Sequence, residues 1–144
     1  MAVVNKMEKI TIYKPDELNQ INDLIHDCFF DIDRITVNNN TFILYFTRYL
    51  ESRKKPVNRW FFFKQYEIPG LECILEIHEV KSYSIKDTQK VQFYDLNELA
   101  FDQATNMVKI RTEIPLSIEI EVLSLKISVV ITDKIISSKK VWGF

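Results

Sequence analysis

Residues 29–49 read FFDIDRITVNNNTFILYFTRY, and this stretch decides the fold. Two runs rich in β-branched and aromatic residues, 29–37 and 41–49, are joined by three asparagines at 38–40. Asparagine tolerates the left-handed backbone conformation that a tight hairpin turn requires. In the second run, large side chains occupy both the even positions (42, 44, 46) and most of the odd positions. The stretch therefore predicts a hairpin whose second strand is covered on both faces, as a central strand is.

The same period of two continues along the chain. Residues 71–80, LECILEIHEV, place Leu71, Cys73, Leu75 and Ile77 on one face and Glu72, Ile74, Glu76 and His78 on the other. Further strands are expected over 8–13, 91–94 and 107–113. From residue 116, apolar side chains occupy even positions up to Val122 and odd positions from Leu123 onward. Such a phase slip predicts a bulge or a tight strand-to-strand corner near these two residues.

One helix is expected, near the front of the chain. Pro15 suits a first helical position, and two acids follow it where the helix dipole favours negative charge. Leu18, Ile21, Leu24 and Ile25 then fall on one stripe at helical spacing, which predicts a helix over about 15–26. The whole pattern predicts one α+β domain over 1–144. Its main part is an antiparallel sheet bent into a sandwich or a partly open barrel, with the helix packed on one face or closing one end.

Other segments are expected to interrupt the sheet. Residues 50–58 read as a polar break, and Pro69 with Gly70 reads as another. Between them, four consecutive aromatics at 60–63 predict a segment covered on both sides. Asp95 and Glu98 have the spacing of a capping box, which predicts a helical turn over 96–101.

Composition excludes several classes of function. The chain has 144 residues, 47% of them hydrophobic, and its 19 Lys and Arg against 20 Asp and Glu give a net charge of −1, which argues against nucleic acid as a partner. With two glycines, the chain lacks the glycine-rich loops that bind phosphates. No signal peptide and no apolar stretch of membrane-spanning length is evident, so we expect a cytoplasmic protein with no membrane partner. The basic run Arg53–Lys55, close to Arg59 and Trp60, is then interpreted as a solvated turn.

No cofactor or metal is expected. The soft-metal ligands are His26, Cys28, Cys73 and His78. Cys73 and His78 point to opposite faces of a regular strand, so one metal ion could not bind both. Cys28 follows a helix C-terminus, whose partial negative charge disfavours a thiolate, and we interpret both cysteines as reduced structural thiols. His26 and Asp27 are interpreted as a structural helix end.

Residues 18–46, LNQINDLIHDCFFDIDRITVNNNTFILYF, combine a helix ending at Ile25, His26 and Asp27 with two long strands about a short turn. This stretch resembles small β-rich bacterial domains of uncharacterised function, some of which are similar to immunity proteins of contact-dependent toxin systems. The later strands, 107–132, share only the general style. The resemblance implies a small non-enzymatic binding protein, and it implies no catalytic residue.

The leading hypothesis is therefore a protein-binding module that is not an enzyme, in its most specific form an immunity-type protein that neutralises a toxin. Its candidate contact surface for a basic protein partner comprises Glu72, Glu76, His78, Glu79, Glu119 and Glu121. The same acids are also what the solvated side of any sheet displays. The alternative is a small-molecule-binding protein or enzyme, with a pocket lined by Phe42, Phe46, Trp60, Phe62 and Tyr94. A third option is a homo-oligomer that associates through strand edges or the tail 139–144.

Overall fold

The computed structural model describes residues 8–60 and 62–143. The described residues form the strands β1 (Glu8–Ile12), β2 (Phe29–Asn38), β3 (Thr41–Tyr49), β4 (Lys55–Trp60), β5 (Phe63–Ile77), β6 (Val80–Lys86), β7 (Phe93–Asp95), β8 (Glu98–Asp102), β9 (Met107–Arg111), β10 (Ser117–Val122) and β11 (Ile127–Gly143). The helix α1 spans Leu18–Ile25, and short 3-10 turns, η1 and η2, span Pro15–Glu17 and Glu51–Arg53.

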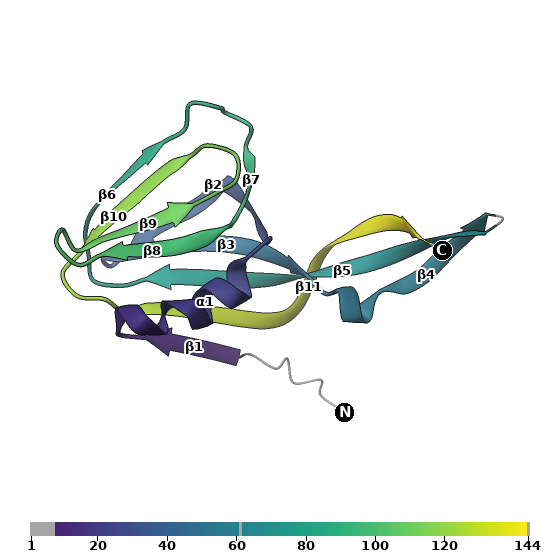
Figure 1. Ribbon diagram of the computed structural model, residues 1–144, viewed down its shortest axis with the longest axis horizontal. Helices are drawn as coiled ribbons and strands as arrows, with labels where there is room; N and C mark the ends of the chain where they lie inside the picture. The colour runs from purple at the N-terminus through teal and green to yellow at the C-terminus, as the bar shows by residue number, and fades with distance from the viewer. Residues whose placement is uncertain (1–7, 61, 144) are drawn as a thin grey trace.

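The strands form two antiparallel sheets that are not joined into a closed barrel (Figure 1). One sheet has the order β1-β11-β5-β3-β2-β7, with β4 added to β5, and the other has the order β6-β10-β9-β8. The inner faces of the two sheets contribute to one core cluster, which includes Leu44 and Leu75 from the first sheet and Val108 and Ile120 from the second. The predicted mainly antiparallel architecture with one short helix is confirmed.

The predicted hairpin is present, with β3 in a central position. Asn39 and Asn40 form its turn with φ values of 50° and 60°, so both adopt the left-handed conformation. β3 lies between β2 and β5, which explains why both of its faces carry large side chains. Phe42, Leu44 and Phe46 are at most 2% exposed and belong to the core.

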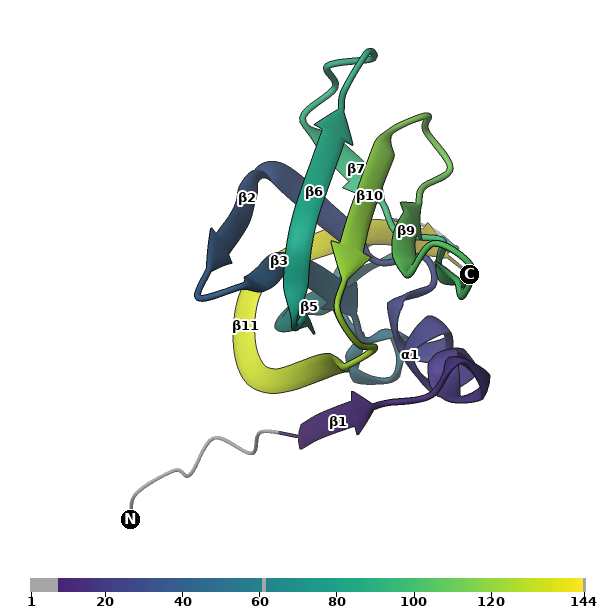
Figure 2. The same ribbon diagram turned by 90° about the vertical axis from the view of Figure 1, so that its left-hand side faces the viewer.

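The helix closes one side of the space between the sheets. It begins as a 3-10 turn at Pro15, continues as α1, and buries Leu18, Ile21 and Ile25. Figures 1 and 2 show it between β1 and the four-stranded sheet. Asn22 pairs with the edge of that sheet like a neighbouring strand, because its side-chain amide donates to the Leu99 carbonyl (3.2 Å) and accepts from the Leu99 N–H (2.7 Å). α1 therefore both fills the core and satisfies the backbone of β8.

The predicted strand-to-strand corner lies where the phase slip placed it. β10 ends at Val122 with a register shift after Glu121, and β11 begins at Ile127 in the other sheet. The Leu123 N–H donates to the Glu79 carbonyl (2.8 Å), which fixes the turn. The slip thus marks the point where the chain changes sheets.

Three strands extend well beyond the second sheet and form a projection (Figure 1). We call residues 54–69 and 137–143 the arm, which consists of β4 and the outer parts of β5 and β11, and we call the remaining described residues the body. Two predictions were wrong here. β5 runs without a break through Pro69 and Gly70, and β4 occupies 55–58, the last part of the polar break expected over 50–58. Pro56 is tolerated because β4 pairs on one side only, so no ladder hydrogen bond is lost.

The aromatic run 60–63 is also not covered as predicted. Phe61 lies outside the described residues, whereas Trp60 and Phe62 are 61% and 84% exposed at the tip of the arm. The helical turn predicted over 96–101 is also wrong, because the chain forms β8 there instead. The Asp95 carboxylate accepts hydrogen bonds from the backbone N–H groups of Glu113 and Ile114, so it anchors a loop and does not cap a helix.

Candidate functional site

The structure does not assemble the aromatic pocket proposed as an alternative site. Phe42, Phe46 and Tyr94 are at most 2% exposed and pack in the core, whereas Trp60 and Phe62 are at the tip of the arm. The Tyr94 hydroxyl is used internally, as a donor to Asp87. The prediction placed all five rings together inside the bent sheet, which fails for Trp60 and Phe62 because the second sheet does not extend over the arm.

The structure also separates the residues predicted as an acidic contact surface, which are Glu72, Glu76, His78, Glu79, Glu119 and Glu121. Glu72 and Glu76 lie on β5 and face outward from the seven-stranded sheet. Glu119 and Glu121 lie on β10 and face outward from the four-stranded sheet, on the other side of the core. Glu79 occupies the turn between β5 and β6 with a φ of 56°.

Several of these acids are paired with cations of their own sheet. Glu72 contacts Arg34 at 3.1 Å and Lys134 at 3.7 Å. Glu121 contacts Lys81 at 3.4 Å. The Glu72 side chain is 12% exposed and that of Glu121 is 32% exposed, so both acids are partly covered by the sheet and matched by its own cations. The charge available to a partner at these positions is correspondingly reduced.

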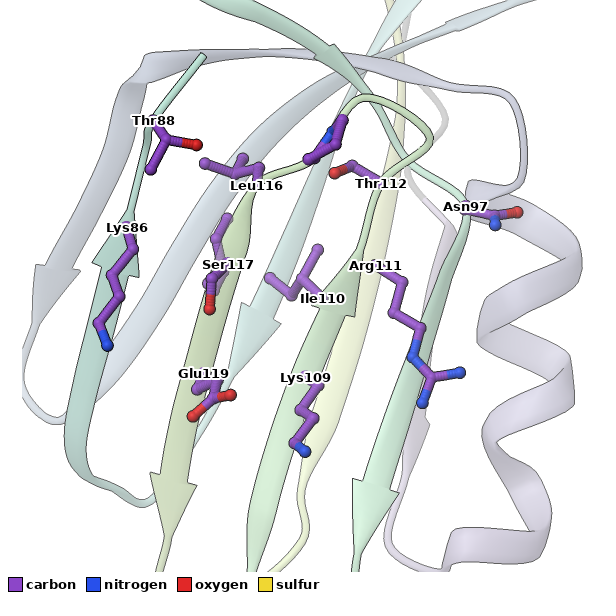
Figure 3. Close-up of a pocket in the computed structure, with 12 residues that line it drawn as sticks. Lys86, Thr88, Asn97, Lys109, Ile110, Arg111, Thr112, Leu116, Ser117 and Glu119 are labelled. Atoms are coloured by element: carbon purple, nitrogen blue, oxygen red, sulfur yellow. The ribbon is translucent and has the colours of Figure 1, made fainter. Parts of the chain in front are cut away.

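An open hollow of about 600 Å³ lies on the four-stranded sheet (Figure 3). Lys109 on β9 and Glu119 on β10 are direct cross-strand partners there, as Figure 3 also shows. Arg111, on the same strand as Lys109, is paired with Glu98 at 2.7 Å. Lys86 on β6 also lines the hollow, so its charged side chains are mainly basic. The hollow is wide and open, and its polar groups do not converge on one point.

Ser128, His78 and Glu76 have the composition of a catalytic triad but a different geometry. The Ser128 hydroxyl lies 3.3 Å from Nε2 of His78, and the Glu76 carboxylate lies 3.7 Å from the same nitrogen. In a triad the serine and the acid use different ring nitrogens. Ser128 is 0% exposed and shares a second hydrogen bond with Thr11 of β1 (2.9 Å). These groups connect β1, β11 and the end of β5 and present no nucleophile.

The two cysteines are free thiols in the core, as predicted from the sequence. Burial raises the pKa of Cys28 to about 12 and that of Cys73 to about 11. Because only the thiolate attacks or binds metal, both thiols are chemically inert near neutral pH.

The junction between helix and hairpin is exposed. Nδ1 of His26 lies 3.1 Å from the Asp27 carboxylate, and the two side chains are 59% and 81% exposed. Among the described residues, no group of three or more His, Cys, Asp or Glu side chains is placed to hold a metal ion. In the same part of the chain, no helix is both long and apolar enough to cross a membrane.

A patch that sequence analysis missed lies at the β7 edge of the seven-stranded sheet. Phe29 pairs with Asp95, and Asp31 pairs with Phe93, so two phenyl rings and two carboxylates alternate on one face. Phe29 and Phe93 are 43% and 60% exposed. We call Phe29, Asp31, Phe93 and Asp95 the edge patch.

Two hollows flank the edge patch, and both are lined by Phe29 and Phe93. One, of about 320 Å³, reaches Tyr45 and Arg34. The Cζ atom of Arg34 lies over the Tyr45 ring, 4.8 Å from its centroid. The other, of about 490 Å³, is bounded by Asp27, Asp95, Glu113, Ile114 and Lys139. The ion pairs within the described part of the chain involve neither Asp31 nor Asp95 nor Glu113.

The sequence contained only a weak signal for this patch. Residues 30–33 alternate apolar with acidic side chains, but the pairing of β2 with the short strand β7 is not encoded locally. Comparisons with protein-family models, with curated proteins and with solved structures find no match for this chain, so the function has to be argued from its own residues.

Proposed function

We propose that this protein is a non-enzymatic binding module whose edge patch takes up a basic segment of a protein partner. The observation that carries the proposal is the exposure of Phe29 and Phe93 between the carboxylates of Asp31 and Asp95, which take part in none of the ion pairs between described residues. Aromatic rings surrounded by polar groups are typical of the residues that dominate a protein interface. The acids supply complementarity to a cationic partner and increase the rate of encounter.

The absence of activated groups among the candidate residues supports a binding role. The thiols of Cys28 and Cys73 are held protonated by burial, and Ser128 is not arranged as a nucleophile. The edge patch itself consists of two phenyl rings and two carboxylates, which can bind a cationic, partly apolar segment without any chemical step.

The resemblance to immunity proteins gives this proposal its most specific form. The partner would then be a toxin domain with a basic surface, encoded beside the gene of this protein. Coexpression of the neighbouring reading frame with this protein should restore growth if that frame encodes the toxin. Growth that stays inhibited, together with no binding between the two purified proteins, would exclude the immunity role.

The binding role itself is tested with a pair of variants. Tagged wild-type protein is used to capture partners from native lysate, in parallel with Phe93→Ala and with Leu123→Ala. Leu123 is 67% exposed in the turn after β10, so its variant controls for the loss of an exposed apolar side chain. A partner held by the wild type and by Leu123→Ala, but lost with Phe93→Ala, is then purified.

Calorimetry with the purified partner measures the effect on affinity. Loss of a ring at the centre of an interface costs about 2 kcal/mol or more, so Phe93→Ala should weaken binding by a factor of about 30 or more. Equal affinity of the wild type and Phe93→Ala for every captured protein would show that the edge patch is not the contact surface.

A further inference from the structure

The chain as a whole is nearly neutral, but its charge is unevenly distributed, with a basic arm and an acidic remainder. The arm carries six basic side chains, Lys54, Lys55, Arg59, Lys64, Lys139 and Lys140, and one acidic side chain, Glu67. The rest of the chain therefore holds 13 of the 19 basic residues and 19 of the 20 acidic residues. The argument from net charge against a polyanionic partner applies to the body and not to the arm.

Two of these cations face each other across the strands of the arm. Arg59 and Lys64 are direct partners in the pairing of β4 with β5. Like charges in this position destabilise a sheet. None of the ion pairs between described residues involves Arg59, Lys64, Lys55 or Lys140. An anion bound here would relieve the repulsion, which makes this part of the arm favourable for a negatively charged ligand.

Register places aromatic rings and hydrogen-bonding groups on one face of the arm. Directly paired residues share a face, and the pairing gives three successive rows: Trp60 with Phe63, then Asn58 with Gln65 and Trp142, then Lys55 with Glu67 and Lys140. Rings lie nearest the tip, amides share the next row with a ring, and lysines flank Glu67 in the third. We call these eight residues the arm face.

The rings of the arm face line one hollow together with Asn58 and Arg59. Asn58, Arg59, Trp60, Phe63 and Trp142 line a space of about 540 Å³. Trp60 and Trp142 are 61% and 55% exposed, and Trp60 stacks on Phe63 with centroids 6.5 Å apart. The hollow thus offers indole rings together with an amide and a guanidinium, which are the groups that stack on bases and bind their edges or phosphates.

We propose that the arm face binds single-stranded nucleic acid, with bases stacked on Trp60 and Trp142 and phosphates held by Lys55 and Lys140. Arg59, which pairs with Lys64 in the register and is not part of the arm face, lines the same hollow and supplies a third cation at its edge. Stacking requires unpaired bases, which favours a single strand over a duplex. A flexible polyanion can follow cations spread along a narrow arm, whereas a folded acidic surface would have to match each cation separately. The acidic body repels the rest of the strand, so the binding site is short. This proposal goes beyond the protein-binding role and uses none of the edge patch.

The test uses fluorescence anisotropy of the full chain with a labelled 12-nucleotide oligothymidylate, compared with a duplex of the same length. Wild type should bind the single strand more tightly than the duplex. Each base stacked on a ring contributes about 1–3 kcal/mol, so Trp142→Ala should weaken binding by a factor of about 5 to 150. Tyr83→Ala is the matched control, because Tyr83 is 50% exposed on the body. This control should bind like the wild type.

A second variant keeps the test valid if Trp142→Ala disturbs the arm. Phosphate contacts give a slope of log affinity against log salt of about −0.7 for each phosphate neutralised on a single strand. Arg59→Gln should therefore lower affinity and reduce the magnitude of the slope by about 0.7. Circular dichroism and denaturant unfolding verify that each variant is folded.

Several outcomes would overturn the proposal. One is no anisotropy change in low salt with protein in large excess. Tighter binding to the duplex, or equal loss in Tyr83→Ala and Trp142→Ala, would also refute it. Tighter binding to vesicles containing phosphatidylserine or to polyglutamate would reassign the arm to a membrane or an acidic protein. Light scattering that shows arm-dependent oligomers without the oligonucleotide would reassign it to self-association.

Discussion

The body and the arm share two long strands, β5 and β11, but differ in what covers these strands. β5 and β11 have 15 and 17 residues, and the four-stranded sheet covers only the part of each that lies in the body. Leu75 and Val129 are fully buried in the body, whereas Phe62 and Trp142 are largely exposed in the arm. The difference shows that hydrophobic content and period define a strand, while the partner layer decides whether that strand belongs to a core or to a surface.

The two regions should therefore differ most in how a lost aromatic ring affects stability. Phe42→Ala removes a fully buried ring between the sheets and should lower the free energy of unfolding by about 3–5 kcal/mol. Phe62→Ala removes a ring that is 84% exposed and should change it by less than about 0.5 kcal/mol. Urea unfolding followed by fluorescence measures both. Similar losses in the two variants would mean that the arm contributes to the core.

The junction between the regions depends on the absence of a side chain at Gly70. A Cβ atom there would lie 2.6 Å from the Ser137 hydroxyl and 2.7 Å from a methyl carbon of Thr47, both closer than packed side chains allow. Gly70→Ala should therefore cost about 1–3 kcal/mol, because strands on both sides have to move.

A matched control for this change lies at the other glycine. A Cβ atom at Gly143 would meet Tyr66 at 3.5 Å, which is an ordinary contact, so Gly143→Ala should have little effect on stability. Thermal unfolding of both variants separates the close approach at Gly70 from a general effect of replacing glycine. Unchanged stability of Gly70→Ala would show that the junction adapts easily.

What the sequence predicts well depends on local signals. The asparagine turn, the helix over 15–26 and the phase slip at Val122 are each decided by neighbours in sequence, and the structure contains all three. The alternation of apolar and polar residues also assigned the core face of β5 correctly, because every second residue of a strand lies on the same face.

The features that the sequence did not predict depend on which strands pair and on which sheet each strand joins. The alternation of apolar and polar residues placed Glu72 and Glu119 on outer faces. It could not show that these two faces belong to different sheets. The alternation also could not show that β5 extends beyond the edge of the second sheet. Trp60 was therefore predicted to lie in a covered segment. The edge patch depends on pairing between β2 and the three-residue strand β7, which is far away in sequence.

The edges of the two regions differ as well, since α1 closes the β8 edge of the body. Asn22→Ala would leave the buried Leu99 N–H without its acceptor and should lower the free energy of unfolding by about 1–3 kcal/mol. Asn19→Ala, at an exposed position of the same helix, is the control and should change stability by a few tenths of a kcal/mol at most. Hydrogen exchange should also show faster exchange at β8 in Asn22→Ala alone. Equal exchange in both variants would show that β8 is protected by packing and not by the asparagine.

The smallest expected effect is a pH dependence of the free energy of unfolding, and it comes from His78 in the body. Burial lowers the pKa of His78 below its ordinary value of 6.5, and nearby Lys126 and Lys9 act in the same direction, while Glu76 and Glu79 oppose it. Above pH 6.5 the imidazole is neutral in both the folded and the unfolded chain and has no effect. As the pH falls below 6.5 the unfolded chain takes up the proton first, so the folded state loses stability until His78 is also protonated in it. Unfolding measured between pH 7.5 and 5 should therefore show a loss of stability that is smaller in His78→Gln than in the wild type. Identical pH profiles would mean that Glu76 compensates fully for the burial of the ring.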